Sequence, residues 1–341
     1  MQEKTLAKSA ILMVGLVVAV IISWELYLRN QGIEIAYDDG PPLWSHKRDM
    51  VYEAKDKTLV FAGSSRMKYD LDIPTWNKNT RCHAVQLAIE GSSPRPVMED
   101  LANDPNFKGR LIVDATEGLF FSNHGFRRPK ENIQYYHERT PAQQVSFELN
   151  HLLESQFVFL DKDNLSLNAK LDAFEIPSRK GVFMMPIFPI DFQQNTFDRQ
   201  IYMTEKFEKD TNLQNKVSGI WQFFNSMSAG APPMSEAEMD AIFQSVKTNI
   251  DKIKGRGGEV LFIRPPSSGP ELEGELKEFP REKYWDRLLA FTGCQGIHFA
   301  DYPETKHFIC PEDSHLTRRD AGIFTAHIMQ VMEQEKGWKL H

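Results

Sequence analysis

The sequence has little cysteine, no excess of basic residues and only one long apolar run. Three of its 341 residues are cysteine, which excludes a small domain held together by many disulfides. The formal net charge of −7 argues against a nucleic-acid partner, because proteins that bind nucleic acids carry a basic surface. No cysteine or histidine spacing matches a zinc site, so we expect neither a metal nor another cofactor. The length is sufficient for one large domain with a buried core.

The cysteines leave two interpretations open. Cys294 and Cys310 flank one predicted strand region and could form a disulfide, which would fit a protein outside the cytoplasm. Alternatively, these two residues and Cys82 are all buried thiols. The odd number excludes complete pairing within one chain.

The single long apolar run covers residues 9–28. About 20 such residues span a bilayer as a helix. Lys4 and Lys8 precede the run, and acidic residues crowd its far side, so the positive-inside rule puts the N-terminus in the cytoplasm. We therefore predict a cytoplasmic N-terminus and transmembrane anchor at 1–29, a polar stalk at 30–58 and an external domain at 59–341. A cleaved signal peptide is the alternative, but no small-residue cleavage pattern follows the run.

The stretch LVFAGSSR, Leu59 to Arg66, predicts a buried strand that ends in a tight turn. In open α/β sheets, ligands bind at the C-terminal edge of the strands. A serine in such a turn can act as a nucleophile only if a base accepts its proton. The best candidate for that base is His315, in PEDSHLTRRDAG.

Strands and helices alternate along much of the chain. Strands are predicted within 83–91, 111–115, 259–264 and 297–299, and a helix over 235–254 begins with a capping box formed by Ser235 and Glu238. This alternation indicates an α/β fold with a mainly parallel sheet. We interpret residues 122–240 as a largely helical insertion over the active-site edge; the alternative is a set of ordinary core helices in a larger α/β domain.

Three motifs occur in a fixed order. Gly63-Ser64-Ser65-Arg66 follows the first strand, Gly91 follows the second in VQLAIEGSS, and Glu312 stands three residues before His315. In this order the chain resembles the SGNH/GDSL hydrolase superfamily, specifically its membrane-anchored branch that acts on cell-surface polysaccharides. The resemblance implies an SGNH-like three-layer α/β/α fold.

The resemblance also implies roles for individual residues. Ser65 would be the nucleophile, His315 the general base and Glu312 the acid that orients it, with the N–H groups of Ser65 and Gly91 in an oxyanion hole. Thr116 stands where the family has the asparagine of its Gly-x-Asn-Asp block, so Thr116 is only a candidate for the third oxyanion donor.

Two further residues are candidates from their positions alone. Asp313, two residues before His315, competes with Glu312 as the triad acid. Arg264 ends the predicted strand EVLFIR, where an arginine could bind a carboxylate or sulfate on a substrate, although a surface salt bridge is the more common role.

Three functions are considered. The resemblance implies first an extracytoplasmic O-acyltransferase, anchored by one helix in a bacterial cytoplasmic membrane, that transfers an acetyl or other acyl group onto a polysaccharide. Its partner would be a membrane-bound O-acyltransferase. The second is a carbohydrate esterase with the same triad. The third, a non-catalytic scaffold of an export or acylation complex, is suggested by the departures from the family pattern at Ser64 and Thr116.

Overall fold

The computed structural model of the chain describes residues 2–52, 58–172, 174, 181–228 and 234–341. The chain divides into two compact units. The helical unit comprises Met1–Asp38 and Pro141–Phe183, and the sheet unit comprises Asp39–Thr140 and Met184–His341.

A five-stranded, wholly parallel sheet forms the centre of the sheet unit, with the strand order β2-β1-β3-β6-β7. The strands are β1 (Thr58–Ala62), β2 (His83–Gln86), β3 (Arg110–Asp114), β6 (Glu259–Arg264) and β7 (Gln295–His298). The predicted α/β fold with a mainly parallel sheet is thus confirmed. A parallel sheet places the C-terminal ends of all its strands at one edge, where the turn after β1 lies.

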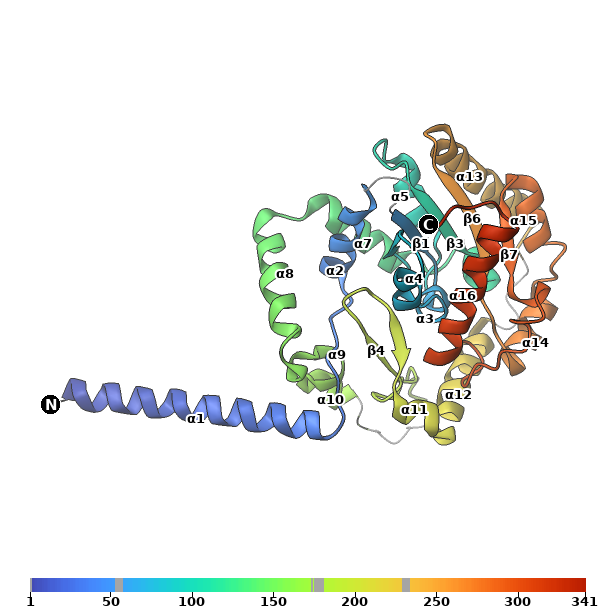
Figure 1. Cartoon of the computed structure of the whole chain (residues 1–341). Helices are drawn as coiled ribbons and strands as arrows, with labels where there is room; N and C mark the ends of the chain where they lie inside the picture. The colour runs from blue at the N-terminus through green and yellow to red at the C-terminus, as the bar shows by residue number, and fades with distance from the viewer. Residues whose placement is uncertain (1, 53–57, 173, 175–180, 229–233) are drawn as a thin grey trace. The chain divides into compact units, whose positions relative to one another are not determined.

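Helices cover both faces of this sheet (Figure 1). In β1, Leu59 and Phe61 pack into one apolar cluster, while Val60 and Ala62 pack into another, because successive side chains of a strand point to opposite faces. The first cluster includes side chains of α3 (Ser65–Asp70), α4 (Ile73–Asn79) and α16 (Arg318–Gln334); the second includes those of α5 (Arg95–Asn103), α13 (Glu236–Gly255) and α15 (Trp285–Thr292).

Local sequence signals set the ends of two of these helices. The Ser235 side chain accepts a hydrogen bond from the Glu238 backbone, and the Glu238 side chain accepts one from the Ser235 backbone, so α13 begins with the predicted capping box. Thr317 caps α16 by accepting a hydrogen bond from the Asp320 N–H. Thr317 lies two residues after His315, at the point where the loop that carries His315 ends and α16 begins.

Part of the segment predicted to be a polar stalk, residues 41–52, instead belongs to the folded sheet unit. Residues 41–52 form α2 (Pro41–Asp49) and η1 (Met50–Tyr52), and residues 53–57 lie outside the described residues. Trp44 is fully buried in the apolar cluster of one sheet face and donates a hydrogen bond to the Leu87 carbonyl oxygen. Arg48 is also fully buried, between Asp100 and Asp104. This part of the predicted stalk is therefore core, because its large side chains are enclosed by the sheet unit.

The predicted insertion at 122–240 is divided between the two units. Within the sheet unit it provides α7 (Arg127–Glu138), the antiparallel strands β4 (Gln193–Asn195) and β5 (Ile201–Met203), α11 (Glu205–Lys209) and α12 (Thr211–Ser228). The β4–β5 pair was not predicted. Residues 173, 175–180 and 229–233 of this region lie outside the described residues.

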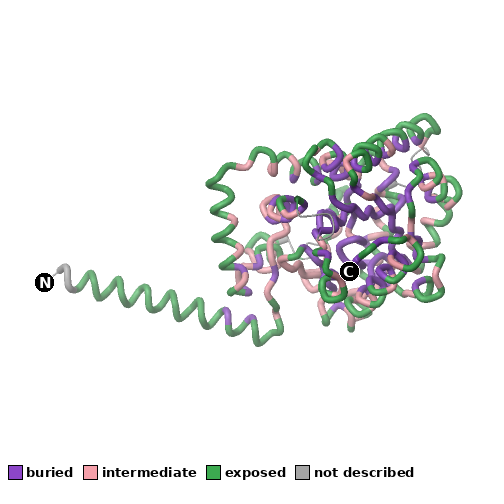
Figure 2. Tube along the Cα trace, turned by 45° about the horizontal axis from the view of Figure 1, so that its top comes forward, coloured by how far each residue is buried: buried purple, intermediate pink, exposed green. Residues whose placement is uncertain are grey.

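The helical unit contains α1 (Gln2–Asn30), α8 (Pro141–Glu154), η2 (Val158–Leu160), α9 (Lys162–Leu165) and α10 (Leu167–Asp172). Within α1, the stretch Thr5–Asn30 is long and apolar enough to cross a membrane: its most apolar 18-residue window has a mean hydropathy of 2.4, and none of the side chains in that window is buried. Figure 2 shows this exposure along α1, in contrast to the buried strands of the sheet unit.

All three cysteines are buried, and none forms a disulfide. Cys294 belongs to the apolar cluster on one face of the sheet and Cys310 to the cluster on the other. The suggested Cys294–Cys310 bridge is therefore wrong, because the sheet lies between the two thiols.

Candidate active site

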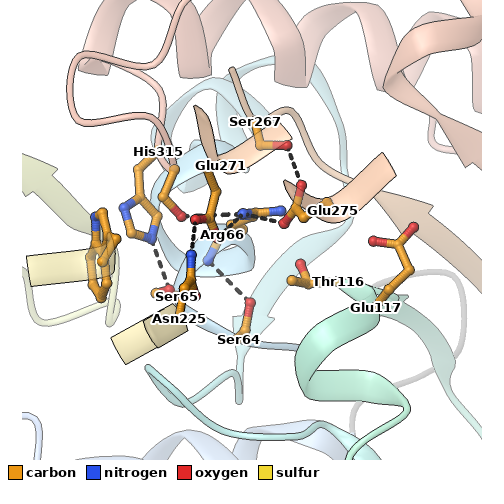
Figure 3. Close-up of polar contacts among 12 residues, drawn as sticks. Ser64, Ser65, Arg66, Thr116, Glu117, Asn225, Ser267, Glu271, Glu275 and His315 are labelled. Carbon is orange, nitrogen blue, oxygen red and sulfur yellow. Dashed lines mark hydrogen bonds and ion pairs between the residues drawn. The ribbon is translucent and has the colours of Figure 1, made fainter. Parts of the chain in front are cut away.

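Ser65, His315 and Glu312 form a continuous chain of hydrogen bonds. Ser65 Oγ lies 2.8 Å from His315 Nε2, and His315 Nδ1 lies 2.8 Å from Glu312 Oε1. The imidazole and the carboxylate are fully buried, whereas Ser65 is partly exposed at the start of α3. Figure 3 shows the Ser65 and His315 side chains facing each other.

The carboxylate determines which ring nitrogen carries the proton. An ionised carboxylate can only accept hydrogen bonds, so His315 Nδ1–H is the donor to Glu312. Nε2 is then free of a proton and accepts the hydrogen bond of the Ser65 hydroxyl. This tautomer is the one that can remove the hydroxyl proton during nucleophilic attack.

Glu312 makes three hydrogen bonds that hold it in place. Oε1 also accepts a hydrogen bond from the His315 backbone N–H at 2.8 Å, and Oε2 accepts one from the indole N–H of Trp221 on α12. Asp313, the competing candidate for the triad acid, accepts its hydrogen bond from Ser218 Oγ at 2.6 Å instead. Glu312 is thus the carboxylate in contact with His315.

Aromatic rings fix the plane of the imidazole. Tyr69 stacks on His315 with ring centroids 4.2 Å apart, and Trp221 approaches the same ring edge-on at 5.8 Å. Tyr69 is one helical turn after Ser65 on α3, so Ser65 and the stacking ring lie on the same side of that helix. Burial raises the pKa of the Tyr69 hydroxyl well above its usual value, which keeps the ring uncharged beside the imidazole.

The turn that presents Ser65 is held from the neighbouring strand β3. Asp114 Oδ2 accepts hydrogen bonds from the Ser64 N–H at 2.9 Å and the Ser64 hydroxyl at 2.5 Å. Gly63 is required here, because a Cβ at this position would lie 2.5 Å from Met67 Cβ and 2.6 Å from Asp114 Cβ. The two adjacent serines therefore have different partners: Ser64 holds the turn, and Ser65 faces the base.

The loop of residues 90–93, called the Gly91 loop below, is held by the segment that follows β3. Gly91 is exposed and has a φ of 57°. Gly125 packs so closely that a Cβ on it would lie 3.2 Å from the Gly91 carbonyl oxygen, and its own carbonyl oxygen accepts a hydrogen bond from the Ser93 N–H. Arg128 donates to both the backbone and the side chain of Glu90.

Thr116 and Arg264 form hydrogen bonds within the protein instead of the oxyanion and substrate contacts suggested for them. The Thr116 N–H and hydroxyl both donate to Asp114 Oδ1 at 2.7 Å, so neither hydrogen is directed to the Ser65 side chain. Arg264 is buried and donates to Glu117, to Glu275 and to the Pro265 carbonyl oxygen. Its guanidinium is thus occupied within the protein, neither in a surface salt bridge nor open to a substrate.

Arg66 connects α3 to the loop that carries His315. Its guanidinium lies 2.7 Å from Glu275 on α14 (Gly269–Glu278) and 3.3 Å from the hydroxyl of Ser314, the residue before His315. Burial disfavours the charged form of Glu275, but the positive charges of Arg264 and Arg66 outweigh this effect and lower its pKa to about 2. The carboxylate remains ionised and keeps both arginines in position.

Three residues that the motifs did not reveal support the site: Asp114, Tyr69 and Trp221. Tyr69 had a weak signal, its four-residue spacing from Ser65, which would place the two on one side of a helix. Asp114 lies near the end of the predicted strand 111–115, where a polar side chain reaches the same sheet edge. Trp221 had no sequence signal, because its contact with Glu312 joins two segments 91 positions apart. No family model and no curated protein matches this chain.

Proposed function

We propose that the protein is a serine-dependent O-acyltransferase that modifies a cell-surface or secreted polysaccharide. The observation that carries the proposal is the hydrogen-bonded series Ser65–His315–Glu312. The order of its motifs and its parallel sheet also agree with an SGNH-like three-layer fold. The proposed location is a bacterial cytoplasmic membrane, with α1 as the single span and the sheet unit on the external side.

In the proposed reaction, Ser65 Oγ attacks the carbonyl carbon of an acyl donor while His315 Nε2 accepts the hydroxyl proton. The negative charge on the former carbonyl oxygen is stabilised by the N–H groups of Ser65 and Gly91, each worth roughly 2.7–4 kcal/mol in comparable sites. His315 then gives its proton to the leaving group, and an acyl-enzyme remains. A sugar hydroxyl, deprotonated by His315, attacks the acyl-enzyme and releases Ser65.

The same residues would serve an esterase, in which water replaces the sugar hydroxyl. A transferase needs a sugar hydroxyl that competes with water for the acyl-enzyme. We expect a membrane-bound O-acyltransferase in the same membrane to supply the acyl group. One experiment therefore tests whether Ser65 is the nucleophile. A second experiment follows the acyl group and so distinguishes transfer from hydrolysis.

A fluorophosphonate that reacts with activated serines tests the nucleophile. We expect mass spectrometry to find the label on Ser65, and we expect Ser65→Ala and His315→Ala both to abolish labelling, since triad members act as a unit. Ser64→Ala is the matched control and should retain the label. A folded protein that labels at Ser64, or not at all, would contradict the assignment.

Transfer is tested with an isotopically labelled activated acetyl ester and the polysaccharide fraction of the source cells. A transferase places the isotope on the polysaccharide in a reaction that requires Ser65, whereas an esterase releases it as acetate with or without the polysaccharide. Release of acetate alone would favour the esterase.

The orientation of α1 is tested with reporter fusions after His341. A reporter that works only outside the cytoplasm should be active when fused after His341, because Lys4 and Lys8 precede the apolar run. Activity of a reporter that works only in the cytoplasm would overturn the proposed location.

A further inference from the structure

The helical unit exposes apolar side chains on two of its helices, beyond those of α1. On α8, Val145, Leu149, Leu152 and Leu153 follow the spacing of one helix face. On α10, Leu167 and Leu171 are one turn apart. All six side chains are exposed: those of Leu149 and Leu167 are 60% and 73% accessible to solvent.

The polarity of the last turn of α8 is the reverse of that of a helix on the surface of a soluble domain. Its Glu154 is buried, with 6% of its surface exposed, while Leu152 and Leu153 on the same turn are 57% and 50% exposed. The buried carboxylate accepts a hydrogen bond from Asn150 Nδ2 at 2.8 Å. In water, such a helix would bury its leucines and expose its carboxylate. The exposed leucines therefore point to an apolar environment outside the protein.

The described part of the helical unit has no apolar core that could hold these side chains. The three apolar clusters found among the described residues all belong to the sheet unit. Phe174, Val182 and Phe183 of the helical unit are exposed as well. A contiguous apolar surface on a soluble protein marks a contact with another molecule or with a membrane.

The helical unit is attached to the end of α1. The Glu25 carboxylate accepts hydrogen bonds from the backbone N–H groups of Val158 and Phe159 at 3.1 and 3.2 Å, and Arg29 donates to the Gln156 carbonyl oxygen at 2.9 Å. These contacts hold the chain just after α8 beside the last turns of α1. In both Figure 1 and Figure 2, α8 runs across the direction of α1. If α1 crosses a bilayer, α8 then runs along its surface.

We propose that the exposed apolar side chains of α8 and α10, Val145, Leu149, Leu152, Leu153, Leu167 and Leu171, together called the lipid face below, lie in the interface of the bilayer that α1 crosses. This inference rests on the membrane span proposed above. The occupant is lipid, because the chain just after α8 is bonded to the last turns of α1, whose apolar side chains are themselves exposed. The lipid face also consists of aliphatic side chains, without the tryptophan, tyrosine or arginine anchors that dominate protein interfaces.

Fluorescence quenching in proteoliposomes tests the proposal on the full chain. Single cysteines introduced as Leu149→Cys, Leu16→Cys and Gln244→Cys are labelled with an environment-sensitive maleimide dye; the native cysteines are buried. The vesicles contain phosphatidylethanolamine and phosphatidylglycerol, with or without lipids that carry a spin label, one set near the headgroup and one set in the middle of the acyl chain, so that both depths are quenched. Position 16 reports on α1, and position 244 lies on the exposed side of α13.

We expect the dye at position 149 to be quenched about twofold or more by the spin-labelled lipids and to emit at shorter wavelength than the dye at position 244. If the dye at 149 behaves like that at 244 while the dye at 16 is quenched, the proposal is wrong. Protection of position 149 only in native membranes would show that a protein covers this face, which also overturns it.

A second variant separates lipid contact from a change in folding. Leu149→Gln with Leu152→Gln should reduce the quenching of a dye at position 145, whereas Gln144→Ala should not. All of these side chains are exposed, so the substitutions remove no internal packing. Fluorophosphonate labelling of Ser65 in the same vesicles reports on the proposed function independently, so either proposal can fail while the other stands.

Discussion

The hydrogen bond from Trp221 to Glu312 offers a sharp test of how the site is held. Trp221→Phe removes the indole N–H from Glu312 Oε2 but keeps an aromatic ring against Phe188, whose centroid is 4.9 Å away. Glu312 retains its two hydrogen bonds with His315 through Oε1. The substitution therefore removes one of the three donors that fix the carboxylate and leaves the other two.

The magnitude follows from the charge of the acceptor. A hydrogen bond to a charged group contributes about 1.5–3 kcal/mol, and each 1.36 kcal/mol changes a rate by about tenfold. If the bond acts by orienting Glu312 and His315, the second-order rate of fluorophosphonate labelling at Ser65 should fall by roughly 10- to 100-fold. The melting temperature should change only slightly, because Trp221 is only partly buried.

Phe224→Leu is the matched control. Phe224 belongs to the same aromatic group, 6.4 Å from Trp221 between ring centroids, and no hydrogen bond links its side chain to Glu312. The control should label at the rate of the unmodified protein. A Trp221→Phe protein that labels within about twofold of that rate would refute the orienting role.

Three further predictions concern packing, charge and the Gly91 loop. Phe243→Ala, on the buried side of α13, should lower the free energy of unfolding by about 3–5 kcal/mol in urea titrations and leave the labelling rate of the folded protein unchanged. Because the pKa of Glu275 is lowered from 4.5 to about 2 in the folded protein, its stabilising contribution of roughly 3 kcal/mol is complete above pH about 4.5 and is lost as the pH falls to about 2. Glu275→Gln should therefore make urea stability depend less steeply on pH in that range; an unchanged pH dependence would contradict this account. Gly125→Ala, at a φ of 72°, should displace the Gly91 loop and slow labelling by roughly tenfold or more, while Gly219→Ala, where an added Cβ meets nothing within 4 Å, should not.

The parts of the fold that could be predicted from sequence were those with strong local signals. The apolar runs of β1, β3 and β6 and the capping box of α13 depend on neighbouring residues alone. The strands β4 and β5 were missed because each has only three residues and β4 is the polar sequence Gln193–Asn195. Residues 41–52 appeared to be a stalk because their few apolar residues show no clear period; Trp44 is buried only by its contacts with distant segments.

The same distinction applies to the candidate site. Ser65, His315 and Glu312 could be selected because their types and order suggested acyl chemistry, and the structure brings them together. The partners of Arg264 could not be predicted, because Glu117 lies 147 positions away in the chain. The oxyanion roles of Ser65 and Gly91 remain predictions.

The separation of Ser65 from His315 by 250 positions has a consequence for the biosynthesis of the protein. Ribosomes make α1 and the turn that carries Ser65 well before the loop that holds Glu312 and His315. A nascent or truncated chain that ends before this loop has Ser65 but lacks the imidazole to which its hydroxyl is hydrogen-bonded. The hydrogen-bonded series can therefore form only after residues 312–315 have been synthesised.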